Sequence, residues 1–150
     1  MRDIKNTQCV GREVRNMGRM HEITFRVRYE ETDTMQVVYY AKYLVWFEVG
    51  RIDLLRSVGV VYRDWERRGL RIPVKEAKAT YHAPARFDDE ILVRTWISDV
   101  GNTSLKFENE IYKLPGKQLL CSGYTVHVLI DKSGRPTKIP KAFIKKFTSP

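Results

Sequence analysis

Residues 22–29, EITFRVRY, carry apolar or aromatic side chains at every second position. A period of two residues is typical of a strand with one buried face, so this segment predicts a half-buried strand. The polar segment 30–34 ends the alternation and separates the strand from the apolar stretch that begins at residue 37. We therefore expect an extended N-terminal element and then a linker.

The most apolar stretch of the chain, residues 37–58, predicts a long helix that begins near Tyr39 or Tyr40. Its apolar residues recur at spacings of three and four, and they cover more than one stripe of the helix surface. A helix of this kind is wrapped by other structure. Gly50 in its interior costs about 1 kcal/mol relative to Ala, which is tolerable where something packs closely against it. Gly59 is expected to end the helix.

After a short helix predicted over residues 62–68, the pattern becomes that of strands. Strands are expected at residues 74–83, with a bulge near Glu76-Ala77, and at 91–97, 105–112 and 118–130, followed by a short amphipathic segment at 138–147. One long helix cannot cover both faces of a parallel sheet. We therefore predict an α+β fold in which a curved antiparallel sheet of about five strands, four of them in a meander, surrounds the helix. The edge strand and open face of such a sheet favour oligomerisation.

The chain has 150 residues, which predicts one domain over 21–150 preceded by a tail over 1–20. Its apolar stretches are too short to cross a membrane, and two cysteines are too few for a disulfide framework. No basic-then-apolar leader is present, so we expect a cytoplasmic location. The formal net charge of +9 indicates either an anionic partner or a solvated basic surface. Nucleic acid is disfavoured as that partner, because no binding motif or basic-aromatic cluster accompanies the charge.

The chemistry-bearing residue of most interest is Asp33, in the linker before the long helix. One interpretation is a turn or capping residue, since Asp favours both roles. The other is a carboxylate facing a cleft at the helix N-terminus, where free N–H groups can stabilise an oxyanion. These groups together would suffice to hydrolyse an activated acyl group. No metal is expected, because His21, His82 and His127 lack ligand spacing.

The run RVRYEETDTMQVVYYAKYLVWFEVGRIDLLRSVG resembles the signature of hotdog-fold acyl-CoA thioesterases of the 4-hydroxybenzoyl-CoA and YbgC-like kind, and YHAPARFDDEILVRTWI and GNTSLKFENEIY also fit that family. The similarity extends over about residues 22–147. It implies a hotdog fold, a homodimer or homotetramer with active sites between subunits, and hydrolysis of a short- or medium-chain or aryl acyl-CoA. It implies no cofactor beyond the coenzyme A of the substrate, and an acyl carrier protein is a further candidate partner.

The resemblance also assigns residue roles. Asp33 matches the catalytic Asp, which attacks the thioester carbonyl or activates a water, and the backbone amide of Tyr40 matches the oxyanion donor. The expected substrate-binding residues are Tyr29, Val37, Val38, Tyr43 and Phe47, although core packing explains most of them equally well.

Two positions depart from the family pattern. Tyr40 stands where many YbgC-like members have His, and Gln36 stands where Gly is usual, at a position that can require a positive φ. These departures motivate an alternative, a protein on the same fold that binds acyl-CoA or acyl carrier protein without catalysis. A carboxylate on the helix, Glu48, is expected to pair with Arg51 or a nearby loop rather than to act in catalysis.

Overall fold

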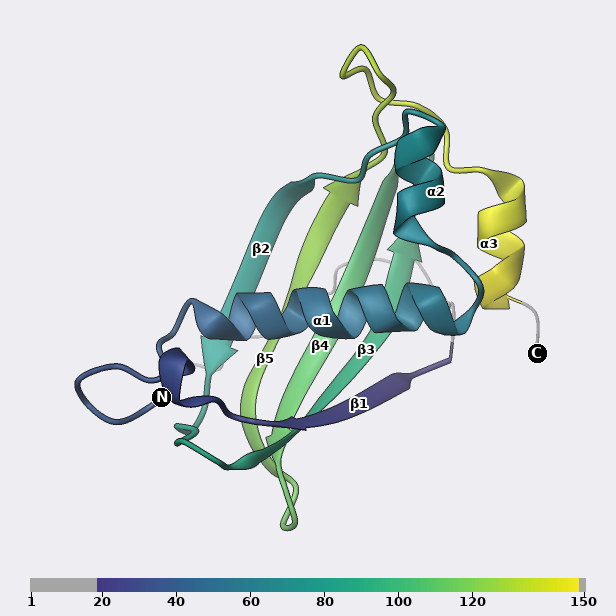
Figure 1. Ribbon diagram of the computed structural model, residues 1–150. Coiled ribbons are helices and arrows are strands. Elements are labelled where there is room, and N and C mark those ends of the chain that lie inside the picture. The colour runs from purple at the N-terminus through teal and green to yellow at the C-terminus, as the bar shows by residue number, and fades with distance from the viewer. Residues whose placement is uncertain (1–18, 149–150) are drawn as a thin grey trace, which may run out of the picture.

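The architecture of the chain, seen in a computed structural model that describes residues 19–148, is an antiparallel sheet curved around one long helix (Figure 1). The expected tail over residues 1–20 therefore lies outside the described residues except for its last two, as does Cys9. Five strands form the sheet in the order β1-β3-β4-β5-β2. The α+β prediction is confirmed. The strands are β1 (His21–Arg26), β2 (Val74–Tyr81), β3 (Glu90–Val100), β4 (Ser104–Lys113) and β5 (Gln118–Val128), and the helices are the short 3-10 turn η1 (Tyr29–Glu31), α1 (Lys42–Ser57), α2 (Tyr62–Arg67) and α3 (Lys141–Thr148).

The main differences from the sequence prediction concern the start of α1 and the strand order. The helix begins at Lys42 rather than at Tyr39 or Tyr40, because the Tyr39 N–H donates to the Glu31 carbonyl at 2.9 Å and holds this segment extended. The predicted four-strand meander is wrong for β2, which pairs with β5. A hairpin between β2 and β3 needs a short connection, whereas residues 82–89 lie between the two strands. The strands β3, β4 and β5 do form a meander.

The long helix lies on the concave side of the sheet with its middle in close contact with β3. A Cβ built on Gly50 would run into Thr95 Oγ1 and lie 2.8 Å from Val93 Cγ1. The expectation that something packs closely against this glycine is therefore confirmed. The sheet bulges between Val74 and Glu76, close to the predicted position.

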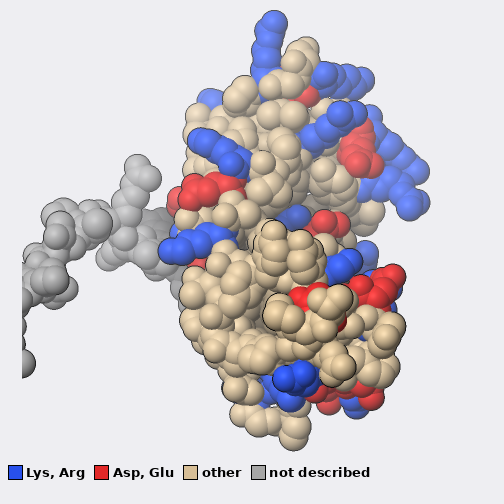
Figure 2. Space-filling view, turned by 90° about the vertical axis from the view of Figure 1, so that its left-hand side faces the viewer, with Lys and Arg blue, Asp and Glu red and all other residues tan. Residues whose placement is uncertain are grey.

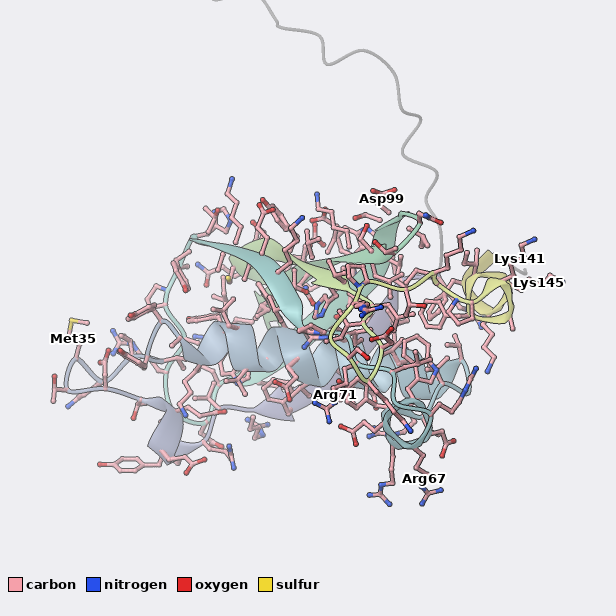
Figure 3. All side chains as sticks on the ribbon, turned by 90° about the horizontal axis from the view of Figure 1, so that it is seen from above. Met35, Arg67, Arg71, Asp99, Lys141 and Lys145 are labelled. Atoms are coloured by element: carbon pink, nitrogen blue, oxygen red, sulfur yellow. The ribbon has the colours of Figure 1, made fainter. Side chains whose placement is uncertain are left out.

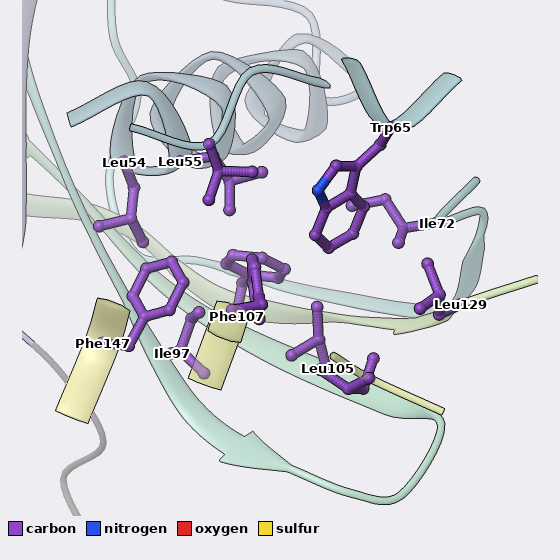
Figure 4. Packing of buried hydrophobic residues seen from close by; sticks show 12 residues of the cluster. Leu54, Leu55, Trp65, Ile72, Ile97, Leu105, Phe107, Leu129 and Phe147 are labelled. Carbon is purple, nitrogen blue, oxygen red and sulfur yellow. The ribbon is translucent and has the colours of Figure 1, made fainter. Parts of the chain in front are cut away.

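Buried apolar residues form two clusters, one at each end of α1. The first joins Leu54 and Leu55 to α2, α3 and the ends of the central strands, with Trp65 and Phe147 among its largest members (Figure 4). The second contains Trp46 and Phe47 of α1 together with buried residues of β3, β4 and β5, and residues of β1 pack against it. The C-terminal segment that the sequence predicted to be amphipathic is α3, and its apolar face packs into the first cluster.

A belt of buried polar residues separates the two clusters. In each central strand a polar side chain stands between members of one cluster and members of the other: Thr95 in β3, Asn109 in β4, and Thr125 with His127 in β5. Arg51 of α1 completes the belt, with its guanidinium 3.5 Å from Thr125 Oγ1 and over the ring of Phe107. Burial lowers the pKa of Arg51 from its usual value.

The stability of the fold is expected to depend on pH through His127. Burial lowers the pKa of this imidazole to about 4, while its Nδ1 lies 2.8 Å from the Ile72 carbonyl. The native state keeps the ring neutral, so the unfolded chain takes up a proton first as the pH falls. The contribution of His127 to the free energy of unfolding is at most about 3 kcal/mol. It is fully present above about pH 6.5 and is lost as the pH drops toward 4.

Urea unfolding at pH 7 and pH 4.5 measures this fall. The variant His127→Gln should show a shallower pH dependence between these values, whereas His82→Gln, at an exposed ring, should keep that of the parent chain. An unchanged slope in His127→Gln would refute the assignment.

Candidate active site

The loop between η1 and α1 is closed by a small ring of backbone contacts that fixes the position of Asp33. A bridge joins Thr32 to Val38, and the Asp33 N–H donates to the Val37 carbonyl at 2.9 Å. At the loop tip, the Gln36 N–H donates to the Asp33 carbonyl at 2.9 Å. Gln36 has φ 61°, so this position does take the left-handed conformation that glycine adopts at least cost.

The side chain of Asp33 is a turn residue and faces a cavity at the same time. Its Oδ1 accepts a hydrogen bond from the Met35 N–H at 2.8 Å, as in many Asp turns. Within residues 19–148 no cation forms an ion pair with it. The turn contact thus orients a half-buried carboxylate without neutralising it.

The cavity at Asp33 has a volume of about 600 Å³ and a mainly apolar and aromatic lining. This is within the range of about 300–1,000 Å³ typical of small-molecule sites. It brings together five of the seven residues that the sequence analysis singled out. The lining residues are Asp33, Met35, Val37, Val38, Tyr39, Tyr40, Tyr43, Tyr81, His82, Ala83 and Pro84.

The other two expected residues lie elsewhere. Tyr29 is 78% exposed and stacks edge-on against Phe87, because the chain leaves the strand conformation after Arg26 and Tyr29 falls in η1. Phe47 is fully buried in the core beneath α1. Glu48 is exposed and forms no ion pair with Arg51 or with any other described residue.

Tyr40 lines the same cavity and lies two residues before the start of α1. Ala41 is the residue that caps the helix, so Tyr40 precedes it in a turn. Among the described residues nothing accepts a hydrogen bond from the Tyr40 N–H or from the Ala41 N–H, whereas the Tyr39 and Lys42 amides both have acceptors. The helix dipole adds partial positive charge at this end. An unpaired donor here can bind a carbonyl oxygen that gains negative charge.

Tyr81 also lines the cavity, although the sequence analysis did not assign this residue to the site. Its hydroxyl donates to the Tyr40 carbonyl at 2.9 Å, and its ring lies 5.3 Å from that of Tyr43. Burial raises the pKa of both phenols, so they are neutral donors and acceptors near pH 7. The YHAPAR segment was visible as part of the resemblance, but only the pairing of β2 with β5 brings it to the helix N-terminus.

Glu31 holds the loop between η1 and α1 in place, and the sequence analysis did not assign this residue to the site either. It is only 5% exposed, and its carboxylate accepts from the Trp46 indole N–H at 3.0 Å and from the Arg28 N–H at 2.8 Å. Its carbonyl accepts from Tyr39 N–H. Because the segment around Glu31 contains only acidic and hydroxylated residues, its pattern does not indicate which side chain is buried.

Removing this anchor should destabilise the protein and loosen the site. Glu31→Ala leaves the buried Trp46 indole N–H and the partly buried Arg28 N–H without partners, and a buried donor left unpaired costs about 1–3 kcal/mol. We expect a clear loss in the free energy of unfolding, measured by urea denaturation, and a fall in activity. The control Glu30→Ala changes an exposed neighbour and should be near neutral. Equal stability of the two variants would contradict the anchoring role.

Within the described part of the chain, no group of three or more His, Cys, Asp or Glu residues could hold a metal ion. The same residues contain no helix that is both long and apolar enough to span a bilayer. Burial raises the pKa of the Cys121 thiol to about 12, so that thiol is not an activated nucleophile.

Comparison with known proteins gives consistent similarities. Residues 27–147 match the sequence profile of the thioesterase-like superfamily. A putative acyl-CoA thioesterase, YneP of Bacillus subtilis, is 38% identical over 78% of this chain and 85% of its own length. The acyl-CoA thioester hydrolase YbgC of Escherichia coli O157:H7 is 31% identical over 81% and 91%. The acyl-acyl carrier protein thioesterase ATL3 of Arabidopsis thaliana is 29% identical over 89% and 70%.

The fold has close counterparts among solved structures. A 4-hydroxybenzoyl-CoA thioesterase, solved as a mutant with 4-hydroxybenzoyl-CoA, superposes with a TM-score of 0.79 over 87% of this chain and 99% of that chain. The two sequences are 19% identical, so this likeness concerns the fold.

Proposed function

Because the chain belongs to the thioesterase-like superfamily and is an acyl-CoA thioesterase of hotdog fold, we propose that the cavity at Asp33 is its active site. The observation that carries the proposal is that Asp33 and Tyr40 line one cavity, while the Tyr40 N–H has no acceptor in the described chain. A proton acceptor or nucleophile and an oxyanion donor are the two groups that hydrolysis of an acyl thioester requires.

In the proposed reaction the thioester carbonyl oxygen accepts from the Tyr40 N–H while its carbon faces Asp33. The carboxylate either attacks that carbon directly or takes a proton from a water that attacks it. The carbon–sulfur bond then breaks, coenzyme A leaves as the thiol, and the acid is released after addition of one water. Because the donor is a backbone group, the reaction does not need the His that many relatives carry at position 40.

The acyl group is proposed to occupy the apolar part of the cavity. Val37, Val38 and Tyr43 line it, and Tyr81 provides a further aromatic wall. A lining rich in aromatic rings fits an aryl or medium-length acyl chain. The carrier is proposed to be coenzyme A, with an acyl carrier protein as a second candidate, since the relative ATL3 is named for that carrier.

The working unit is proposed to be a homodimer or homotetramer with the site near a subunit boundary. In the described structure β2 is an edge strand, and seven of its eight residues are exposed. Unprotected edges invite pairing with a second copy, which by two-fold symmetry runs antiparallel. The cavity reaches this edge through Tyr81, the last residue of β2. Light scattering of the purified protein measures its mass, and a monomer would contradict this part of the proposal.

A panel of acyl-CoAs tests the function. The purified protein is offered short, medium, long and aryl acyl-CoAs, and free thiol is detected by a colour reagent. We expect thiol release with a preference for medium or aryl chains. Tight binding without release for any chain would favour the alternative, a protein that only binds acyl-CoA.

A further inference from the structure

The excess positive charge of the described chain lies at one end of the molecule. Residues 56–71 and 130–147 contain eleven Lys and Arg against three Asp and Glu, while the rest of the described residues contain twelve against thirteen. We call these eleven cations the basic end. They are Arg56, Arg63, Arg67, Arg68, Arg71, Lys132, Arg135, Lys138, Lys141, Lys145 and Lys146.

The basic end is one continuous surface built from three segments. Trp65 of α2 packs on Phe143 of α3 with ring centroids 5.0 Å apart, and the Lys146 ammonium donates to the Gly59 carbonyl at 3.3 Å. Arg71 forms a bridge with Ile130 at the start of the third segment, the connection between β5 and α3. The aromatic residues Trp65, Phe143 and Phe147 are thus turned inward. Figure 2 shows several of the cations as blue groups, with a few red ones among them, at the top of the molecule.

The cations of this surface are exposed and mostly unneutralised. All eleven are exposed, and within residues 19–148 only Arg56 and Arg67 have a carboxylate within 4 Å, from Asp53 and Asp64. Like charges held together in this way repel each other, and an anionic partner relieves the repulsion. Figure 3 places Arg67, Lys141 and Lys145 well away from Met35, which lies at the cavity end.

The shape and chemistry of the basic end favour an acidic protein over other anions. Coenzyme A carries its phosphates on one nucleotide, which a few cations suffice to bind. Single-stranded nucleic acid is held by cations interleaved with aromatic rings, whereas the exposed aromatic residues of the described chain, such as Tyr40 and Phe87, lie outside the basic end. A membrane-binding helix needs a free apolar face, and that of α3 is buried through Phe143 and Phe147.

We infer that the basic end is the docking surface for an acidic acyl carrier protein that delivers the acyl thioester. This inference rests on the proposed thioesterase activity and on the proposed pairing along β2. Arg71 precedes the Val74 end of β2, and antiparallel pairing places that end of one copy beside the Tyr81 end of the other. The basic end of one subunit would therefore adjoin the cavity of its partner, within reach of a carrier's flexible arm.

The test compares one acyl group on two carriers. The full-length chain hydrolyses the acyl group from coenzyme A and from an acidic acyl carrier protein at low and at physiological salt. The variant Arg67→Glu/Lys145→Glu is compared with Lys117→Glu, which reverses an exposed charge in the turn between β4 and β5. We expect the first variant to raise KM for the carrier-bound substrate about tenfold at low salt, with kcat and the kinetics on acyl-CoA little changed. The second variant should match the parent on both substrates.

Unchanged carrier kinetics in the first variant, with acyl-CoA hydrolysis intact, would overturn the inference while leaving the thioesterase proposal in place. Failure to hydrolyse either substrate would instead refute the proposed function. Duplex DNA and vesicles of anionic phospholipid are titrated as competing ligands. If either binds the parent more tightly than the carrier does, and loses binding in the first variant, the surface is not a carrier site.

Discussion

Asp33→Asn is expected to lower kcat/KM for acyl-CoA hydrolysis by about a thousandfold, with little change in stability. A side-chain amide is neither a base near pH 7 nor a nucleophile of useful strength, and such groups contribute about 10²–10⁴ to the rate. The fold should persist because the Asn carbonyl oxygen still accepts the Met35 N–H that Asp33 Oδ1 accepts at 2.8 Å. Steady-state thiol release and urea unfolding measure the two quantities.

The chain offers a matched control for this substitution. Asp131 forms the same kind of turn, with its Oδ1 accepting the Ser133 N–H at 2.8 Å, and it does not line the cavity. Asp131→Asn should therefore keep the parent's rate on acyl-CoA. Activity of Asp33→Asn within a few fold of the parent would remove Asp33 from the catalytic centre, and an equal loss in both variants would point to a general effect of such turns.

Gly123→Ala is expected to lower the free energy of unfolding by about 2–3 kcal/mol, by forcing β2 away from β5. A Cβ at this position would run into the backbone carbonyl of Lys78 and lie 3.1 Å from the Ala79 Cα. Backbone atoms in a paired strand cannot rotate aside as a side chain can. Because Tyr81 belongs to the displaced strand and lines the cavity, hydrolysis should fall as well. Urea unfolding and thiol release test this expectation together.

Gly116→Ala is the control, since nothing lies within 4 Å of a Cβ built there. It should leave both the free energy of unfolding and the activity close to those of the parent. If Gly123→Ala unfolds at the same urea concentration as Gly116→Ala, then β2 shifts to accommodate the added Cβ without loss of stability. The described register of β2 with β5 would then not fix the position of Tyr81 in the cavity.

Much of the fold was predictable because periodicity reports burial directly. The alternation in β1 corresponds to a half-buried face, and one face of α1 is buried in the core. The other apolar residues of the helix, Leu44, Val45 and Val49, are exposed in the described chain, so the helix is less fully covered than its broad apolar surface predicted. The place of β2 was not predictable in this way. Its residues are nearly all exposed in the described chain, so its pattern carries no information on which strand it joins.

The site was predictable in part for a related physical reason. Asp33 and the residues that come after it in sequence reach the cavity through local chain geometry, and the resemblance marked them. Tyr81 reaches it only through pairing with β5, and Glu31 is buried by contacts with Trp46 that no short-range pattern encodes. Tyr29 does not line the cavity of the described chain, because the strand ends three residues before it. Positions set by long-range pairing are thus the ones that sequence reasoning missed.

Product analysis decides whether the cavity at Asp33 hydrolyses acyl thioesters or only binds them. The purified chain and Asp33→Asn are each incubated with the preferred acyl-CoA, and free thiol, free acid and bound substrate are quantified together. We expect the parent to release thiol and acid in equal amounts, and Asp33→Asn to bind the acyl-CoA without releasing either. Substrate that binds to the parent and is recovered intact would contradict the account.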